Sequence, residues 1–203
     1  MLSSRSVFPA LFKVAAAVAL SAVALCAAVP RGWYLAGSKP QAYQSGIDDA
    51  QHNGHRIAYL KSVTPTPDGF GTLMQDFRAD DYAGKRVRFS AMLKADNVAN
   101  WAGLWMRIDK ANGASSSPKT LAFDNMQDRP VKGTEDWKSY QVVLDVPNDA
   151  TGIFFGVLLN GPGDVLMSDV KIETVGLDVA TTAPPTSAGQ SRPNAPTNLD
   201  FAQ

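Results

Sequence analysis

The stretch of sequence that decides the fold is Trp101-Ala-Gly-Leu-Trp-Met-Arg-Ile-Asp109, because its residues alternate with the two-residue period of a β-strand. One set of alternate residues is apolar throughout and predicts a strand face buried in a core: Ala102, Leu104, Met106 and Ile108. The other set places two indoles, a guanidinium and a carboxylate around a glycine: Trp101, Gly103, Trp105, Arg107 and Asp109. Since Trp and Arg are enriched among the anchors of binding surfaces, we expect this second face to bind a ligand.

Short segments of the same kind extend from Val29 to Val175 and are separated by residues typical of turns. The expected strands are 33–37, 56–63, 70–79, 86–94, 101–109, 119–126, 137–146, 152–160 and 164–175. The sequence predicts no amphipathic helix of about ten residues or more between them. We therefore predict an all-β fold, a two-sheet antiparallel β-sandwich of the jelly-roll type.

One of the expected strands is apolar on both of its faces. In Ile153-Phe-Phe-Gly-Val-Leu-Leu159, neither set of alternate residues is polar. A strand of this kind is typical of a position at the centre of a sheet, covered on both sides. We therefore expect other side chains to lie over its second face as well.

The composition narrows the range of partners. Among 203 residues, Lys and Arg number 19 and Asp and Glu number 19, so the formal net charge is +0. Nothing in this balance favours phosphate backbones or anionic membranes, and we expect no nucleic-acid partner. Cys26 is the only cysteine, which excludes an internal disulfide and a cysteine-based metal cluster.

The chain divides into three expected parts. Residues 1–28 resemble a secretory signal peptide, because Arg5 and Lys13 precede an apolar run that ends in small residues. Residues 29–175 form the β-sandwich domain, and residues 176–203 are expected to be a disordered tail rich in Pro, Thr and Ser. This division predicts a periplasmic or secreted protein, with contact to a membrane only if the N-terminal segment is retained.

The mature protein is expected to begin near Val29 and to carry no lipid. At about 1.5 Å per residue the run from Val14 to Val29 spans roughly 24 Å, less than the ~30 Å hydrocarbon core of a bilayer. Leu25 stands where lipoproteins carry a small residue before their cysteine. Mass spectrometry of the exported protein checks this. An intact N-terminus, or a diacylglycerol adduct on Cys26, would contradict it.

The second half of the domain resembles galactose-binding-like jelly rolls, including carbohydrate-binding modules. The similarity lies in Asp136-Trp-Lys-Ser-Tyr-Gln-Val-Val-Leu-Asp-Val-Pro147, in Ile153-Phe-Phe-Gly-Val-Leu-Leu-Asn-Gly-Pro-Gly163 and in Ser168-Asp-Val-Lys-Ile-Glu173. It implies the fold and a carbohydrate-like ligand. The final strand departs from the pattern, because Val165-Leu-Met-Ser-Asp169 lacks the usual aromatic residue before the Asp.

Residues 33–175 also resemble a little-characterised bacterial domain that occurs exported on its own and joined to transcriptional regulators. This similarity is clearest in Trp101 to Asp109 and in Leu121-Ala-Phe-Asp-Asn-Met-Gln-Asp-Arg-Pro130. It implies no established activity.

The leading candidate site consists of Trp101, Trp105 and Arg107. Indole faces stack on sugar rings and other flat apolar surfaces, and a guanidinium donates hydrogen bonds in a fixed fork to hydroxyls or carboxylates. The alternative is structural: a loop covers both indoles, and Arg107 pairs with a nearby Asp.

A second candidate group lies in one turn: Asp124, Asn125, Gln127, Asp128 and Arg129. Its oxygens suit a ligand or a hard cation such as a structural Ca²⁺. The spacing matches no defined loop motif, and Asx side chains also stabilise turns through their own backbone, which favours a structural turn. Gln75 and Asp76 interrupt an apolar strand and are candidates for the same cleft.

The sequence contains no catalytic motif and implies no cofactor. His52 and His55 are the only histidines, and two ligands without a third make a poor metal site. We therefore predict an exported, non-catalytic binding module for a carbohydrate-like or other small polar ligand. Two alternatives remain: a structural or protein-interaction module that binds an envelope protein, and a glycan hydrolase that uses carboxylates such as Asp124, Asp128 and Glu135.

Overall fold

The computed structural model describes residues 29–112 and 117–183, and the expectations for residues 1–28 lie outside this part of the chain. Within these residues nine strands form an antiparallel sheet that curls into a sandwich: β1 (Tyr34–Gly37), β2 (Tyr43–His52), β3 (His55–Ser62), β4 (Phe70–Arg78), β5 (Arg86–Lys110), β6 (Lys119–Asp124), β7 (Val131–Asp145), β8 (Gly152–Asn160) and β9 (Asp164–Val175). Two short 3-10 helices, η1 (Pro40–Ala42) and η2 (Asp80–Tyr82), lie between strands. Among the described residues, no helix is long and apolar enough to span a membrane.

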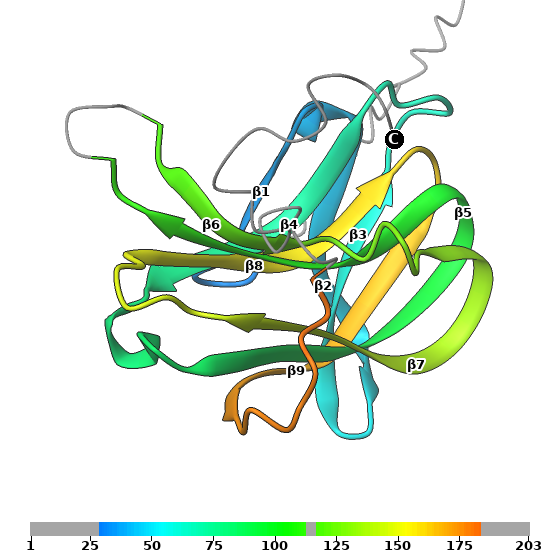
Figure 1. Ribbon diagram of the computed structural model, residues 1–203. Helices are drawn as coiled ribbons and strands as arrows, with labels where there is room; N and C mark the ends of the chain where they lie inside the picture. The colour runs from blue at the N-terminus through cyan, green and yellow to red at the C-terminus, as the bar shows by residue number, and fades with distance from the viewer. Residues whose placement is uncertain (1–28, 113–116, 184–203) are drawn as a thin grey trace, which may run out of the picture.

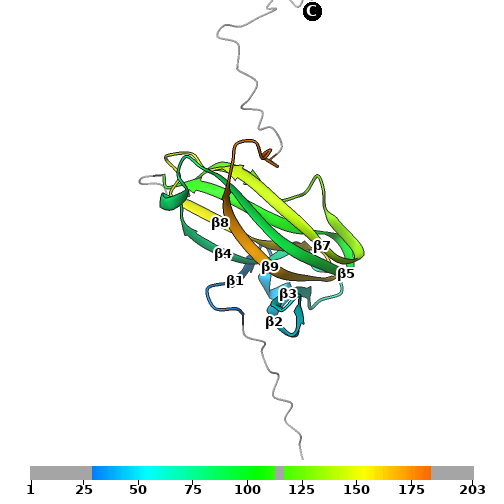
Figure 2. The same ribbon diagram turned by 90° about the horizontal axis from the view of Figure 1, so that it is seen from below.

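The strands lie in two layers, and β5 belongs to both (Figure 1). The first layer contains β1, β4, β8, the second half of β5, and β6. The second layer contains β2, β3, β9, the first half of β5, and β7. Figure 2 shows β7, β5 and β9 side by side in this second layer. The predicted all-β, two-sheet antiparallel β-sandwich is confirmed.

Strand β5 differs from the expectation of separate strands at 86–94 and 101–109. It continues through the intervening residues and bends there from one layer into the other (Figure 1). Its pairing with β7 shifts register between Leu93 and Ala102, and Asn97 adopts a φ of 52°. Bulges bend a strand and increase its twist without ending it, which explains the continuous strand.

Strand β2 is absent from the expected set. Its sequence, Tyr43-Gln-Ser-Gly-Ile-Asp-Asp-Ala-Gln-His52, carries more polar residues than a buried strand does. Among the described residues it is an edge strand that pairs only with β3, and edge strands commonly carry such polar residues. Pairing with a neighbour, rather than local sequence, therefore determines this strand.

The core lies between the two layers, and the apolar face predicted for 101–109 is part of it. Leu104, Met106 and Ile108 are fully buried. From the other half of β5, Phe89 reaches the same core and meets Phe155 of β8 edge to face, with ring centroids 5.0 Å apart. The strand pattern thus identified the inward side of β5 correctly.

The folded domain extends beyond the expected boundary at residue 175. Arg86 Nη1 donates hydrogen bonds to the backbone oxygens of Leu177 at 2.9 Å and Val179 at 2.6 Å. The backbone N–H of Thr182 donates to Val143 O at 2.9 Å. Residues up to Ala183 therefore lie against the second layer, and the remainder of the tail expected at residues 176–203, from residue 184 on, lies outside the described residues.

The pKa values of several carboxyls predict how stability depends on pH. Hydrogen bonds lower the pKa of four carboxyls. Tyr140 donates to Glu135, the backbone N–H of Trp137 donates to Asp136, Arg86 donates to Asp145, and Lys110 donates to Asp149. Burial raises the pKa of Asp164, which acts in the opposite direction. A lowered pKa contributes stability above the ordinary value of about 4, and this contribution is lost as the pH falls through the folded-state value.

We therefore expect the free energy of unfolding to be lower at pH 3 than at pH 6. Urea unfolding at a series of pH values measures it. Equal free energies of unfolding at both ends of this range would contradict the prediction.

Candidate ligand-binding site

A hollow of about 480 Å³ lies on the outer face of the first layer. Aromatic and apolar side chains form most of its lining: Tyr34, Ala36, Gly37, Phe70, Thr72, Met74, Trp105, Arg107, Phe123, Phe154 and Leu158. We call this hollow the aromatic pocket. It is within the usual size range of small-molecule sites.

Strand register brings these residues together from five strands. Arg107 of β5 lies opposite Phe154 of β8 on one side and Phe123 of β6 on the other. Two residues before Arg107 on β5, Trp105 lies opposite Gly156 of β8. A Cβ on Gly156 would collide with the backbone of Leu73 in β4. The missing side chain at Gly156 lets β4 and β8 approach closely beneath the pocket.

Trp105 forms the floor of the aromatic pocket rather than an exposed platform. Only 6% of its surface is exposed, and it packs with Met74 and Leu158 in a small cluster separate from the main core. Its Nε1 donates a hydrogen bond of 2.7 Å to Thr72 Oγ1, which fixes the indole. Trp101 is partly buried against the same cluster but does not line the pocket.

Arg107 combines the two roles that the sequence left open. Its guanidinium lies over the ring of Phe154, 4.8 Å from the centroid, at the wall of the aromatic pocket. Its Nε also donates to Asp109 Oδ2 at 2.9 Å, and the side chain of Asp109 is buried. The buried carboxylate therefore holds the guanidinium in place and balances its charge.

Four aromatic residues of the pocket were not among the predicted site residues: Tyr34, Phe70, Phe123 and Phe154. The apolar second face of β8 was the available signal for Phe154. Phe123 and Tyr34 are exposed to 43% and 41% and can meet a ligand. Tyr34 Oη donates to Asp76 Oδ1 at 2.7 Å, and burial followed by this hydrogen bond raises the pKa of Tyr34 to about 12.

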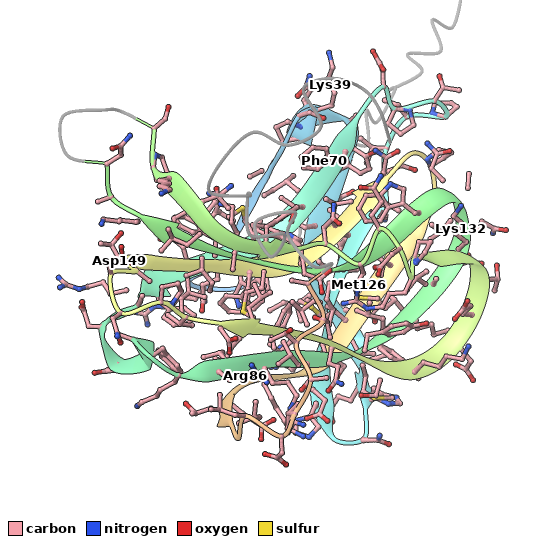
Figure 3. The ribbon with its side chains drawn as sticks, viewed as in Figure 1. Lys39, Phe70, Arg86, Met126, Lys132 and Asp149 are labelled. Atoms are coloured by element: carbon pink, nitrogen blue, oxygen red, sulfur yellow. The ribbon has the colours of Figure 1, made fainter. Side chains whose placement is uncertain are left out.

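The group Asp124 to Arg129 forms a turn after β6, and none of its residues lines the aromatic pocket. Asp124 lies opposite Met106, on the core side of β6. Its oxygens accept hydrogen bonds from Arg129 Nη2 at 2.5 Å, from the backbone N–H of Met126 at 2.8 Å and from Thr182 Oγ1. Met126, near the centre of Figure 3, is buried by this turn.

The remaining polar residues of this turn make their contacts within the turn itself. Asn125 Oδ1 accepts from the backbone N–H of Gln127 at 3.2 Å, and Asp128 pairs with Arg129 at 2.8 Å. A Cβ on Gly103 would lie 3.0 Å from Met126 Cβ, so glycine lets the turn lie close against β5.

Gln75 and the other residues considered for a site lie elsewhere. Gln75 alternates with Met74 and Asp76 and so faces the opposite side of β4; its Nε2 donates to Gly32 O at 3.1 Å. This corrects its assignment to the cleft. Glu135 accepts from Tyr140 Oη at 2.9 Å on β7.

The two histidines do not come together as a metal pair with a third ligand. His52 stacks on Trp137 with ring centroids 4.2 Å apart, whereas His55 lies 3.6 Å from Asp169. Within residues 29–112 and 117–183, no three His, Cys, Asp or Glu side chains gather as a metal-binding group.

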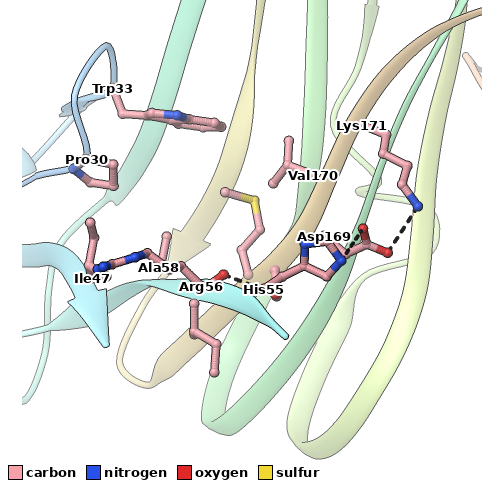
Figure 4. A pocket seen from close by; sticks show the side chains of 12 residues that line it. Pro30, Trp33, Ile47, His55, Arg56, Ala58, Asp169, Val170 and Lys171 are labelled. Carbon is pink, nitrogen blue, oxygen red and sulfur yellow. Dashed lines mark hydrogen bonds and ion pairs between the residues drawn. The ribbon is translucent and has the colours of Figure 1, made fainter. Parts of the chain in front are cut away.

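A second hollow, of about 450 Å³, lies at the margin of the sandwich (Figure 4). The segment before β1 supplies Pro30 and Trp33, and β2, β3 and β9 supply the other side. We call it the marginal cleft. Its lining includes three basic side chains, those of His55, Arg56 and Lys171, and Lys171 Nζ lies 3.2 Å from Asp169 Oδ2.

The fold and the aromatic pocket define an antiparallel β-sandwich domain with a hollow on the outer face of one layer. No family model matches the chain. It is similar, at 45% identity over 154 residues, to the uncharacterized HTH-type transcriptional regulator YbfP of Bacillus subtilis (strain 168). The match covers 75% of this chain and 50% of the regulator, so the chain spans about half the length of this curated relative.

Among solved structures, the enzymatically active domain of tailspike protein 4 from bacteriophage CBA120 is similar with a TM-score of 0.50 and 13% identity, over 71% of this chain and 20% of that one. This likeness concerns the fold alone. The CBM22-1 xylan-binding domain of Paenibacillus barcinonensis Xyn10C gives a TM-score of 0.48 at 12% identity, over 72% of this chain and 88% of that one.

Proposed function

We propose that this protein is an exported, non-catalytic binding module that holds a neutral carbohydrate-like or other small polar ligand in the aromatic pocket. The observation that carries the proposal is the pocket itself. Its exposed rings, Tyr34 and Phe123, stand at a hollow whose floor is the fixed indole of Trp105. Flat aromatic faces of this kind suit the apolar faces of sugar rings, while hydroxyls and a guanidinium set orientation.

The charges at the pocket favour a neutral ligand. Arg107 is the charged residue of its lining, and the buried carboxylate of Asp109 balances it. Tyr34 has a pKa of about 12 and stays uncharged at neutral pH, where it donates to Asp76. A charged ligand would therefore find no uncompensated opposite charge in the pocket.

The same geometry favours binding over glycan hydrolysis. Asp124 and Asp128 are held by Arg129, and Glu135 is held by Tyr140 and Lys138. None of these three carboxylates lines the aromatic pocket. The similarity to half of a regulator is also consistent with binding, because a domain joined to a regulator can serve it by recognising a ligand.

A protein-interaction module is the second candidate, and the exposed rings of Phe123 and Tyr34 are the observation that favours it. An array of neutral glycans, followed by titration of tryptophan fluorescence, separates the two. A soluble glycan that changes the tryptophan emission supports ligand binding. A response to a macromolecular partner alone would support the interaction module.

Phe123→Ala is expected to weaken glycan binding by about 1–3 kcal/mol, because an aromatic contact at the pocket is lost. The side chain is exposed, so the free energy of unfolding should change by less than about 0.5 kcal/mol. Tyr59→Ala is the matched control, since this tyrosine lies on β3 in the other layer. Equal affinities of the two variants would contradict the prediction.

A further inference from the structure

We propose that the marginal cleft is a second binding site, for a small organic anion with an apolar body, such as a medium-chain carboxylate. The aromatic pocket and its ligand play no part in this inference. The cleft is lined by both apolar and basic side chains, and this combination determines the class of ligand.

The inside of the cleft is formed by side chains that also pack in or against the main core. Trp33 lies over it and meets Phe155 of the core edge to face, with centroids 5.4 Å apart. Ala58 and Ile47 lie across the cleft from Trp33 (Figure 4), and Met167 of β9, which pairs with Ala58 of β3, also lines it. An apolar chain inserted between the indole and these strands would therefore be removed from water.

The lining of the cleft carries more positive than negative charge. His55, Arg56 and Lys171 line it, with Asp169 as the acidic residue among them. Asp169 lies between Lys171 at 3.2 Å and His55 at 3.6 Å, so its charge is already compensated. Within the described residues, no hydrogen bond or ion pair engages the Arg56 guanidinium, which leaves its forked donors available to a carboxylate.

The local backbone supports a binding role at this cleft. Pairing of β5 with β9 shifts register between Ser90 and Met92, so that β9 forms a bulge around Asp169. Asp169 itself adopts a φ of 52°, in the left-handed region. Bulges and sparsely populated backbone conformations are over-represented at binding sites, where they re-aim side chains. Here the bulge places Asp169, Val170 and Lys171 together at the cleft.

Three probes test the site by isothermal titration calorimetry on the whole protein: decanoate, decanol and acetate. We expect decanoate to bind, decanol to bind at least about 10-fold more weakly and acetate not to bind, because a hydrogen-bonded charge and an apolar body each contribute about a factor of ten or more. Absence of decanoate binding, or equal binding of decanoate and decanol, would overturn the proposal.

Two variants locate the site. Arg56→Gln should weaken decanoate binding about 10-fold through loss of a charge-assisted hydrogen bond. Val170→Glu places a negative charge at the cleft, where Val170 is exposed, and should also weaken it. Lys132→Gln, on β7 and outside the cleft, is the control expected to bind as the wild type does. Wild-type affinity in both cleft variants, with thermal unfolding unchanged, would place the anion elsewhere and refute the assignment.

Discussion

Asp124→Ala is expected to lower the free energy of unfolding by about 3–5 kcal/mol, the range for removal of one partner from a buried ion pair. The side chain of Asp124 is only 2% exposed, and its loss leaves the guanidinium of Arg129 without its closest acceptor. The backbone N–H of Met126 and the hydroxyl of Thr182 lose their acceptor as well. Urea unfolding monitored by tryptophan fluorescence measures the change.

Asp128→Ala provides the matched control, because it removes a carboxylate that pairs with the same arginine. Asp128 is 62% exposed, and exposed pairs contribute about 1 kcal/mol or less. A similar small loss in both variants would show that the turn does not depend on the buried carboxylate.

Trp105→Ala is expected to cost about 3–5 kcal/mol of stability and to abolish glycan binding in the aromatic pocket. The indole is almost fully buried against Met74 and Leu158, so its removal leaves a cavity, and Thr72 loses a hydrogen-bond partner. Paired denaturation and fluorescence-independent binding measurements, such as calorimetry, report the two effects separately.

Leu104→Ala tests the same strand from its other side. Leu104 is fully buried in the main core, and its replacement should cost about 2–5 kcal/mol without direct contact to a ligand. If Trp105→Ala left stability unchanged while Leu104→Ala unfolded the protein, the indole would be an exposed platform, one of the two arrangements that the sequence left open.

Much of the fold could be predicted because period-two patterns report burial directly. The inward set Leu104, Met106 and Ile108 was identified correctly, and so was the doubly apolar character of β8. The edge strand β2 was missed because pairing with β3, not its own polar sequence, makes it a strand. The single bent strand β5 was divided in two because bulges interrupt the alternation without interrupting the strand.

The candidate site was less accessible from sequence. Trp105 and Arg107 were identified on one face, but whether an indole lies on the surface or on the floor of a hollow depends on the neighbours that register brings to it. Phe154 comes from a strand about fifty positions away in sequence, and Tyr34 lies still further off. The polar turn at Asp124 could not be assigned from sequence, because the sequence does not show that Arg129 pairs with both Asp124 and Asp128.

The passage of β5 through both layers has a consequence for cooperativity. The strand pairs with β6 and β8 in one layer and with β7 and β9 in the other. Neither layer can unfold without disrupting β5 in the other layer, because both halves of this strand contribute to the core between the layers. Unfolding of either layer should therefore unfold the other, and the domain should unfold in a single cooperative transition rather than in two stages.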